Sequence, residues 1–157
     1  MDTLNSDVKF VDIETLVVPT THARKHPEKQ IKKLKNAIAT FGIVTPLVID
    51  QHGNVYAGTA RLEALKRLGV AKVPVLENSH LSEAQLRAYA LADNRIAEDA
   101  CWDETLLKVE LSYLIDCDVE IDLDSTGFEA AEIDSLLIVE SMTAEPGEPA
   151  MPEDESV

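Results

Sequence analysis

The residues of this sequence with the clearest capacity for chemistry form a glycine-led turn, Gly58-Thr-Ala-Arg61, at the start of an expected helix. A helix N-terminus carries about half a positive charge, so an arginine in the first turn is disfavoured unless an anion shares its space. The backbone N–H groups of Gly58, Thr59 and Ala60 and the guanidinium of Arg61 are suited to bind a phosphate there. In the simpler interpretation, Gly58 only turns the chain and Arg61 points to solvent.

Two other places in the chain carry charge that fits such a cleft. Asp93 is expected at the C-terminal end of an apolar helix, where the helix dipole disfavours an anion, so a cationic group or a metal ion should lie beside it. Arg95 follows the apolar stripe of that helix, and Arg24 lies in a donor-rich loop. The simpler interpretation is a surface pair of Asp93 and Arg95 that caps the helix, with Arg24 an ordinary loop residue.

Other residues with chemical potential favour structural roles. No helix holds His22 and His26, so free loop histidines are preferred over a metal pair. In residues 116–124, acids alternate with apolar residues, which predicts an edge strand protected by like charge, and the spacing does not match an EF-hand calcium loop. Neither Cys101 nor Cys117 has a histidine beside it in sequence, so thiol catalysis has no local support.

Hydrophobic periodicity and turn residues predict a small α+β fold around these residues. The expected elements are a strand and turn within 8–16, a helix at 28–40, a strand at 43–50, a turn at 51–54, a strand at 55–57, a helix from 60 that stops at 69, a strand at 72–76, a helix that follows 82 and ends at 93–95, and helices at 103–115 and 130–139. The helix after residue 82 begins with a capping box and is apolar on most sides, so it should be largely buried. We expect Trp102 to fix the acidic helices to the core.

Charge divides the chain into two parts. Residues 1–100 hold 13 Lys and Arg against 12 Asp and Glu, whereas residues 101–157 hold 1 against 17. Such an acidic segment is repelled by a phosphate backbone, so strong autonomous DNA binding is not expected. The sequence shows neither a signal peptide nor an apolar run long enough to cross a membrane. We therefore expect a cytoplasmic protein with no membrane contact.

The order of four motifs resembles that of the ParB N-terminal domain of the ParB/sulfiredoxin superfamily, over about residues 8–100. The motifs are Ala23-Arg-Lys25, Gly42-Ile-Val-Thr-Pro46, Gly58-Thr-Ala-Arg61-Leu-Glu-Ala64 and Asp93-Asn-Arg95. The resemblance implies an α+β fold with a small mixed sheet and flanking helices, followed here by acidic helices. We divide the chain into this nucleotide-binding domain at 8–100, an acidic helical extension packed on it at 101–140, and a disordered acidic tail or linker at 141–157.

The resemblance also implies a site for a nucleoside triphosphate, CTP or ATP, with Mg²⁺. The residues that would contact phosphate are Arg24, Gly58, Thr59, Ala60, Arg61 and Arg95, and those that would serve the metal are Asp93 and Asn94. Thr59-Ala60 replaces the usual Glu-Arg pair of the family, so at most weak triphosphatase activity is expected. Thr59 also stands where sulfiredoxins carry their catalytic cysteine, which argues against sulfinic acid reduction.

The acidic second part is similar to that of ParB-like domains in front of DNA methyltransferases of phages and mobile elements. It implies a module that acts in DNA modification or mobile-element DNA maintenance through a protein partner such as a DNA methyltransferase, and a homodimer is left open. One alternative is a nucleotide-dependent phosphotransferase or triphosphatase. Another is an acidic protein-interaction domain with a vestigial nucleotide site. No residue cluster supports nuclease activity.

Overall fold

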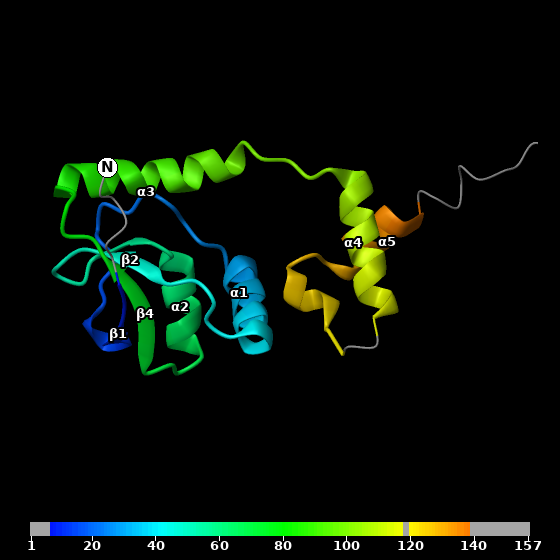
Figure 1. Ribbon diagram of the computed structural model, residues 1–157, viewed down its shortest axis with the longest axis horizontal. Helices are drawn as coiled ribbons and strands as arrows, with labels where there is room; N and C mark the ends of the chain where they lie inside the picture. The colour runs from blue at the N-terminus through cyan, green and yellow to red at the C-terminus, as the bar shows by residue number, and fades with distance from the viewer. Residues whose placement is uncertain (1–6, 118–119, 139–157) are drawn as a thin grey trace, which may run out of the picture.

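The computed structural model describes residues 7–117 and 120–138, which form two parts joined by one long helix and the segment after it (Figure 1). The first part contains the sheet and its helices, and the second is a small helical unit. The expected tail at 141–157 lies outside the described residues. No helix within the described residues is long and apolar enough to span a membrane.

A four-stranded mixed sheet forms the centre of the first part. Its strands are β1 (Val8–Asp12), β2 (Leu47–Ile49), β3 (Val55–Ala57) and β4 (Lys72–Glu77), in the spatial order β1-β4-β2-β3. β4 pairs antiparallel with β1 and parallel with β2, and β2 pairs antiparallel with β3. The expected α+β class with a small mixed sheet is therefore confirmed.

The turn between β2 and β3 is the expected hairpin, but the strand before it is shorter than predicted. The Asp50 carboxylate accepts hydrogen bonds from the backbone N–H groups of His52 and Asn54 at 2.8 and 2.9 Å. Residues 43–46 lie outside β2, although a strand was expected at 43–50. Pro46 has no N–H to donate to a sheet, so pairing begins after it.

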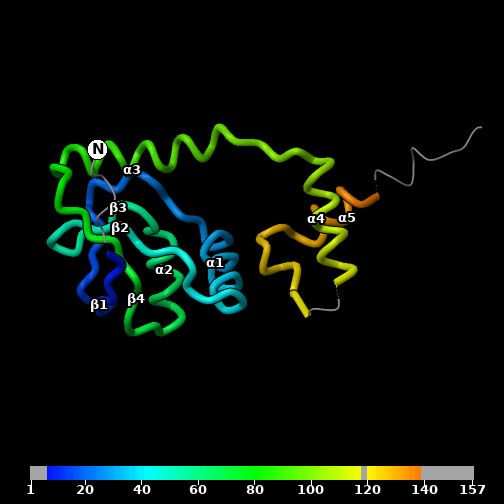
Figure 2. The backbone as a smooth tube through the Cα atoms, in the orientation of Figure 1, coloured from blue at the N-terminus to red at the C-terminus, as the bar shows by residue number. Residues whose placement is uncertain are grey.

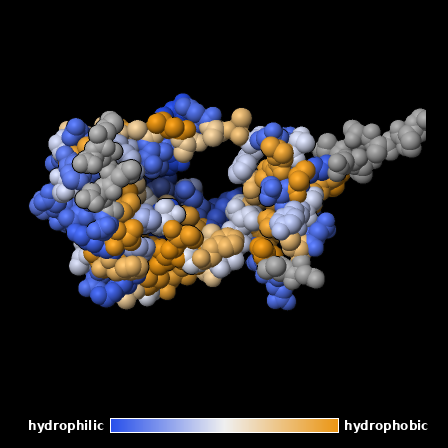
Figure 3. All heavy atoms as spheres, viewed as in Figure 1, coloured by the Kyte–Doolittle hydropathy of each residue, from blue (hydrophilic) through white to orange (hydrophobic). Residues whose placement is uncertain are grey.

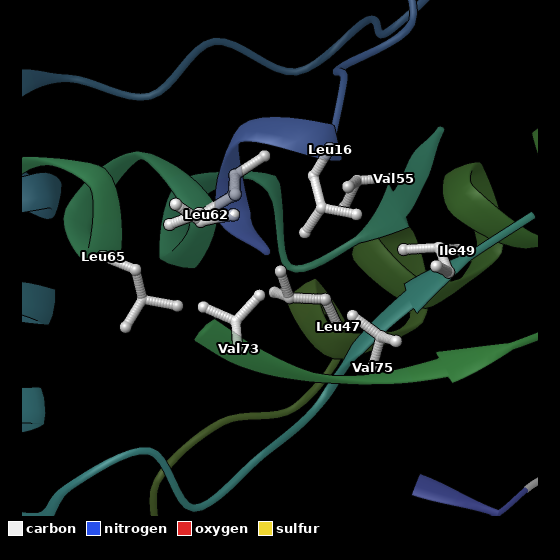
Figure 4. Packing of buried hydrophobic residues seen from close by; sticks show 9 residues of the cluster. Leu16, Leu47, Ile49, Val55, Leu62, Leu65, Val73 and Val75 are labelled. Carbon is white, nitrogen blue, oxygen red and sulfur yellow. The ribbon is translucent and has the colours of Figure 1, made fainter. Parts of the chain in front are cut away.

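Helix α2 (Thr59–Arg67) covers one face of the sheet, and α1 (Glu28–Phe41) packs on α2. Leu62 and Leu65 of α2 extend toward the strands (Figure 4). The other buried members of this core are Ile13, Leu16, Leu47, Ile49, Val55, Val73 and Val75. Ile31 of α1 meets Ala60 and Ala64, whose small side chains let the two helices approach. The core thus fixes the start of α2 firmly.

Helix α3 (Glu83–Glu98) begins with the predicted capping box, because Ser82 Oγ accepts from the Gln85 N–H and Gln85 Oε1 accepts from the Ser82 N–H. The prediction that this helix is largely buried is wrong. Leu86 is its one buried residue, whereas Leu91 and Ile96 are 61% and 69% exposed. Much of its apolar character comes from alanines, which favour a helix without needing burial.

The second part consists of α4 (Glu104–Asp116), a 3₁₀ turn η2 (Leu123–Thr126) and α5 (Ala130–Ile138). The edge strand expected at 116–124 is wrong, since Asp116 belongs to α4 and Leu123 to η2. Of the alternating acids that the structure describes, Glu120 and Asp122 lie between α4 and η2, and no described residue of this stretch pairs with a strand.

The second part contacts the first mainly through α1 and η2. Glu129 pairs with Lys29 and, at 3.3 Å, with Lys33. Trp102 does not fix the helices to the core as expected. It is 68% exposed and packs on Phe128 of the same helical part, with ring centroids 5.3 Å apart. In the space-filling view, an opening separates the two parts beneath the end of α3 (Figure 3).

Candidate functional site

The turn before α2 has the geometry expected for an anion-binding loop. Gly58 is the N-cap of α2 with φ +90°, a left-handed conformation that glycine adopts at little cost. A Cβ at this position would lie 2.5 Å from Leu47 Cδ2 and 3.0 Å from Arg61 Nη1. Glycine is therefore required both by the backbone angle and by the space, and the unpaired N–H groups of the first turn of α2 follow it directly.

Arg61 is partly buried and bonds to backbone carbonyl groups. Its Nη1 donates long hydrogen bonds to the carbonyl oxygens of Thr45 and Pro46, at 3.5 and 3.4 Å. None of the ion pairs among the described residues involves it. Burial lowers the pKa of Arg61, and the charge of Asp93 opposes this effect. Arginine stays charged nevertheless, so a partly desolvated cation lies beside a helix N-terminus.

Thr59 is joined to two histidines that the sequence did not connect with it. Its Oγ1 lies 2.8 Å from Nε2 of His26 and 3.0 Å from Nε2 of His22. The two imidazole rings stack with centroids 5.7 Å apart, and His26 Nδ1 lies 3.0 Å from Oε1 of Gln30. The expectation of free loop histidines is thus wrong. The contacts join the loop before α1 to the start of α2, and no local sequence signal reports such a long-range contact.

The predicted site residues of α3 lie at a different point of the helix than expected. Asp93 was placed at the C-terminal end, but α3 continues to Glu98, so the dipole argument for Asp93 does not apply. The surface pair of Asp93 and Arg95 is not among the ion pairs of the described residues. Asn94 donates from Nδ2 to the carbonyl oxygen of Ala90 at 2.8 Å, which leaves its amide oxygen for other partners.

Both candidate arginines outside α2 form ion pairs. Arg24 lies 2.8 Å from Glu98, and Arg95 lies 2.7 Å from Asp99 and 3.6 Å from Glu98. Because these groups are largely exposed, each pair is weak and an anionic ligand can compete for the arginine. The pair with Glu98 connects the loop before α1 to the end of α3, and this loop passes beneath α3 on its way to α1 (Figure 2).

Two adjoining cavities connect these groups. The smaller one, about 210 Å³, is lined by the turn residues Gly58, Thr59, Ala60 and Arg61 together with Arg24, His26, Gln30, Leu34, Tyr56, Asp93 and Asn94. The larger one, about 360 Å³, lies between the loop before α1 and α3 and includes Arg95, Arg87, Leu91 and Tyr56. They share Arg24, Tyr56 and Asn94, so they form one cleft. The structure brings together every predicted phosphate and metal residue except Arg95 in the smaller cavity and places Arg95 in the larger one.

Family models match two successive regions of the chain. A model described as the ParB N-terminal domain matches residues 2–95. A model described as the ParB-methyltransferase HTH domain matches residues 105–157. The unmatched residues between them, 96–104, comprise the end of α3, the segment that joins it to α4 and the first residue of α4.

Curated relatives match somewhat less than half of the chain. The ParB-like nuclease domain-containing protein YnaK of Escherichia coli (strain K12) is 37% identical over 68 residues, which are 43% of this chain and 78% of that protein. The probable chromosome-partitioning protein ParB of Rickettsia typhi is 30% identical over 70 residues, 44% of this chain and 24% of that protein. This chain therefore spans about a quarter of that ParB.

A solved structure shares the fold of both parts. It is the crystal structure of the C-terminally truncated chromosome-partitioning protein ParB from Caulobacter crescentus complexed with CTP-γ-S. The TM-score is 0.71 with 17% sequence identity, and the match covers 86% of this chain and 79% of that one. At this identity the likeness is one of fold.

Proposed function

Because this chain belongs to the ParB N-terminal domain family, we propose that its cleft binds a nucleoside triphosphate, with the phosphates at the turn 58–61. The observation that carries the proposal is the position of Arg61. A guanidinium that is partly desolvated, forms no ion pair with a carboxylate among the described residues and lies at a helix N-terminus gains most from an incoming polyanion. The adjacent glycine lets the ligand approach the backbone closely.

The cleft has room for the rest of a nucleotide. We assign the phosphates to the smaller cavity and the nucleoside to the larger one, because the larger cavity offers Tyr56 and Leu91 as apolar surface for a base. Arg24 lines both cavities, so it would give up Glu98 for the phosphates. Cytidine triphosphate is the first ligand to test, since the related fold from Caulobacter crescentus was solved with CTP-γ-S.

The residues of the smaller cavity fit a magnesium ion carried by the nucleotide better than a metal held by protein alone. No group of three or more His, Cys, Asp or Glu within the described residues could hold a metal ion. Mg²⁺ in nucleotide sites is commonly held by one or two carboxylates together with phosphate oxygens and water. Asp93, with the amide oxygen of Asn94, would supply the protein ligands, and the ion would neutralise phosphate charge.

We propose that the second part binds a protein partner. The family model that matches residues 105–157 is described as the ParB-methyltransferase HTH domain. Helix-turn-helix units commonly dock on DNA. Here residues 101–157 carry 17 acidic and 1 basic residue, which disfavours a phosphate backbone and favours a basic protein surface. A DNA methyltransferase is the proposed partner, and DNA modification is the proposed setting.

Calorimetry and thermal shift with CTP, ATP and GTP, each with and without Mg²⁺, test the nucleotide site. A ligand at a hundred times its Kd should stabilise the fold by about 2.7 kcal/mol. Arg61→Ala should weaken binding about 10- to 100-fold, because it removes charged hydrogen bonds of about 1.5–3 kcal/mol. Lys66→Ala is the matched control, as Lys66 is an exposed cation on the same helix. Absence of binding by every nucleotide, or equal losses in both variants, would overturn the proposal and favour an interaction domain.

A further inference from the structure

The hydroxyl of Thr59 lies in a hydrogen-bond chain that nucleotide binding alone does not require. His26 Nδ1 faces the amide oxygen of Gln30 at 3.0 Å, and this oxygen can only accept. In the tautomer that satisfies this contact, Nδ1 carries the proton and Nε2 is an acceptor. At 2.8 Å, the partner that donates to Nε2 is the Thr59 hydroxyl.

His22 makes the second hydrogen bond of this hydroxyl. Its Nε2 lies 3.0 Å from Thr59 Oγ1, whose single proton is already directed at His26. In the same arrangement, His22 donates from Nε2 to a lone pair of Oγ1. Burial, followed by the charges of His26 and Arg24, lowers the pKa of His22, which favours the neutral ring at neutral pH. The chain thus consists of an orienting group, Gln30, a base, His26, and a hydroxyl, that of Thr59, each within hydrogen-bond distance of the next.

This order is the arrangement by which proteins activate a hydroxyl nucleophile. We propose that Thr59 accepts a phosphoryl group from the nucleotide in the cleft, with His26 as general base and Gln30 as its positioning residue. The inference rests on the proposed function, because the donor is the bound triphosphate. Thr59 is only 7% exposed and lines the same cavity as Arg61 and Asp93, so the cavity is the route by which a donor reaches it.

The transfer balances without any further reactant. Oγ1 of Thr59 forms a bond to the γ-phosphorus, while the bond from that phosphorus to the β–γ bridging oxygen breaks. The bonding electron pair leaves on the nucleoside diphosphate. The hydroxyl proton moves to Nε2 of His26, and the imidazolium later releases it to water. Arg61 and the N–H groups at the start of α2 offset charge on the transferring group. The product is a phosphothreonine at a helix N-terminus, where its charge is favoured.

The test combines transfer with binding on the same full-length protein. The chain is incubated with CTP or ATP labelled in the γ-phosphate, with Mg²⁺, and acid-stable label is measured per bound nucleotide, with the modified residue located by peptide mass spectrometry. We expect one phosphoryl group on Thr59, retained in Thr59→Ser and lost in Thr59→Val. His26→Gln should slow transfer about 10²- to 10⁴-fold, the range for loss of a general base.

The outcomes separate this inference from the binding proposal. Nucleotide binding without label, or equal label in Thr59→Val, overturns the phosphotransfer and leaves the binding site standing. If no nucleotide binds, the proposed function fails, and a fluorophosphonate reagent then tests the nucleophile by itself. Covalent labelling of Thr59 that disappears in His26→Gln supports an activated hydroxyl, and absence of labelling overturns it.

Discussion

The two parts of this molecule differ in how they are held together. The α+β part buries nine apolar residues in one cluster, with Leu65, Val73 and Val75 fully inaccessible. In the described residues from 104 onward, Leu111 and Ile133 are the buried apolar residues, and Leu106, Val109 and Tyr113 of α4 are about 60% exposed. Orange, hydrophobic residues accordingly appear on the surface of the helical part in Figure 3. The first part has a core of its own, whereas the second depends on what it contacts.

The candidate site belongs to the part with the larger apolar core. Residues 58–61 open α2, which the main core holds, while the acidic residues cluster in the part with little core. The proposed ligand site therefore lies in the part with the larger core, and the proposed partner surface lies in the part with little core. Local stability of this kind is commonly lower where elements bury few apolar contacts.

The largest expected effect comes from removing core volume. Leu65→Ala should cost about 2–5 kcal/mol of unfolding free energy, because Leu65 is fully buried and leaves a cavity. Urea unfolding followed by circular dichroism measures it. Trp102, the one tryptophan, packs on Phe128 and reports on the helical part by fluorescence. Leu111→Ala should instead shift the fluorescence transition together with only the share of the circular dichroism that α4 and α5 contribute. An equal shift of the fluorescence and of the whole circular dichroism transition would contradict a separate core for the first part.

A smaller effect is expected at the turn that opens α2. Gly58→Ala should destabilise the α+β part by about 1–3 kcal/mol, because it combines a strained φ with a Cβ 2.5 Å from Leu47 Cδ2. Gly42→Ala is the matched control, since Gly42 has φ +78° but nothing within 4 Å of its Cβ position. Equal losses in urea unfolding would show that the close approach contributes nothing.

Charge neutralisation at the contact between the parts should have a modest effect. Glu129→Gln removes the ion pairs with Lys29 and Lys33, so amides of η2 and α5 should exchange faster while α2 and β4 keep their protection. Asp134→Asn makes the same charge change at an exposed site of α5 and should leave exchange unaltered. High salt should reproduce the effect of Glu129→Gln in the unaltered protein. Identical exchange in all samples would mean that these pairs do not hold the parts together.

The smallest effect concerns pH. The pKa of His22 is held below its usual 6.5, first by burial and then by His26 and Arg24. A histidine with a lowered pKa binds fewer protons when folded, so unfolding free energy falls as pH drops below 6.5 toward the folded-state pKa. His22→Gln should flatten this dependence. All four histidines precede residue 101, so circular dichroism should show the effect and Trp102 fluorescence should not.

Local rules explain which elements the sequence predicted well. The Gly58 turn, the Ser82 capping box and strands β3 and β4 follow from residues adjacent in sequence, and the structure confirms them. The alternating acids at 116–124 satisfied the strand pattern equally well, but a strand needs a neighbour and the sheet offers none there. Periodicity alone does not report whether a partner exists.

The candidate site was predictable in part for the same reason. The turn at 58–61 is a local motif, and the placement of charge together with the family resemblance pointed to Arg24 and the Asp93 region, which the structure brings to the same cavity. His22 and His26 were missed because their contact with Thr59 spans more than thirty residues. The burial of α3 was overestimated because alanine counts as apolar yet does not demand a core.

Because the C-terminal half of α3 is largely exposed, we expect the side of the cleft that it forms to open and close locally. Asp93 and Asn94 lie on a stretch where Leu91 and Ile96 bury little, and Glu98 ties its end to Arg24 by an exposed ion pair. Such a segment opens locally more often than the sheet beneath it. A ligand that contacts this part of α3 must order it, so part of the binding free energy is used to slow its local opening. The occupancy of the cleft and the lifetime of the ordered C-terminal end of α3 therefore rise together.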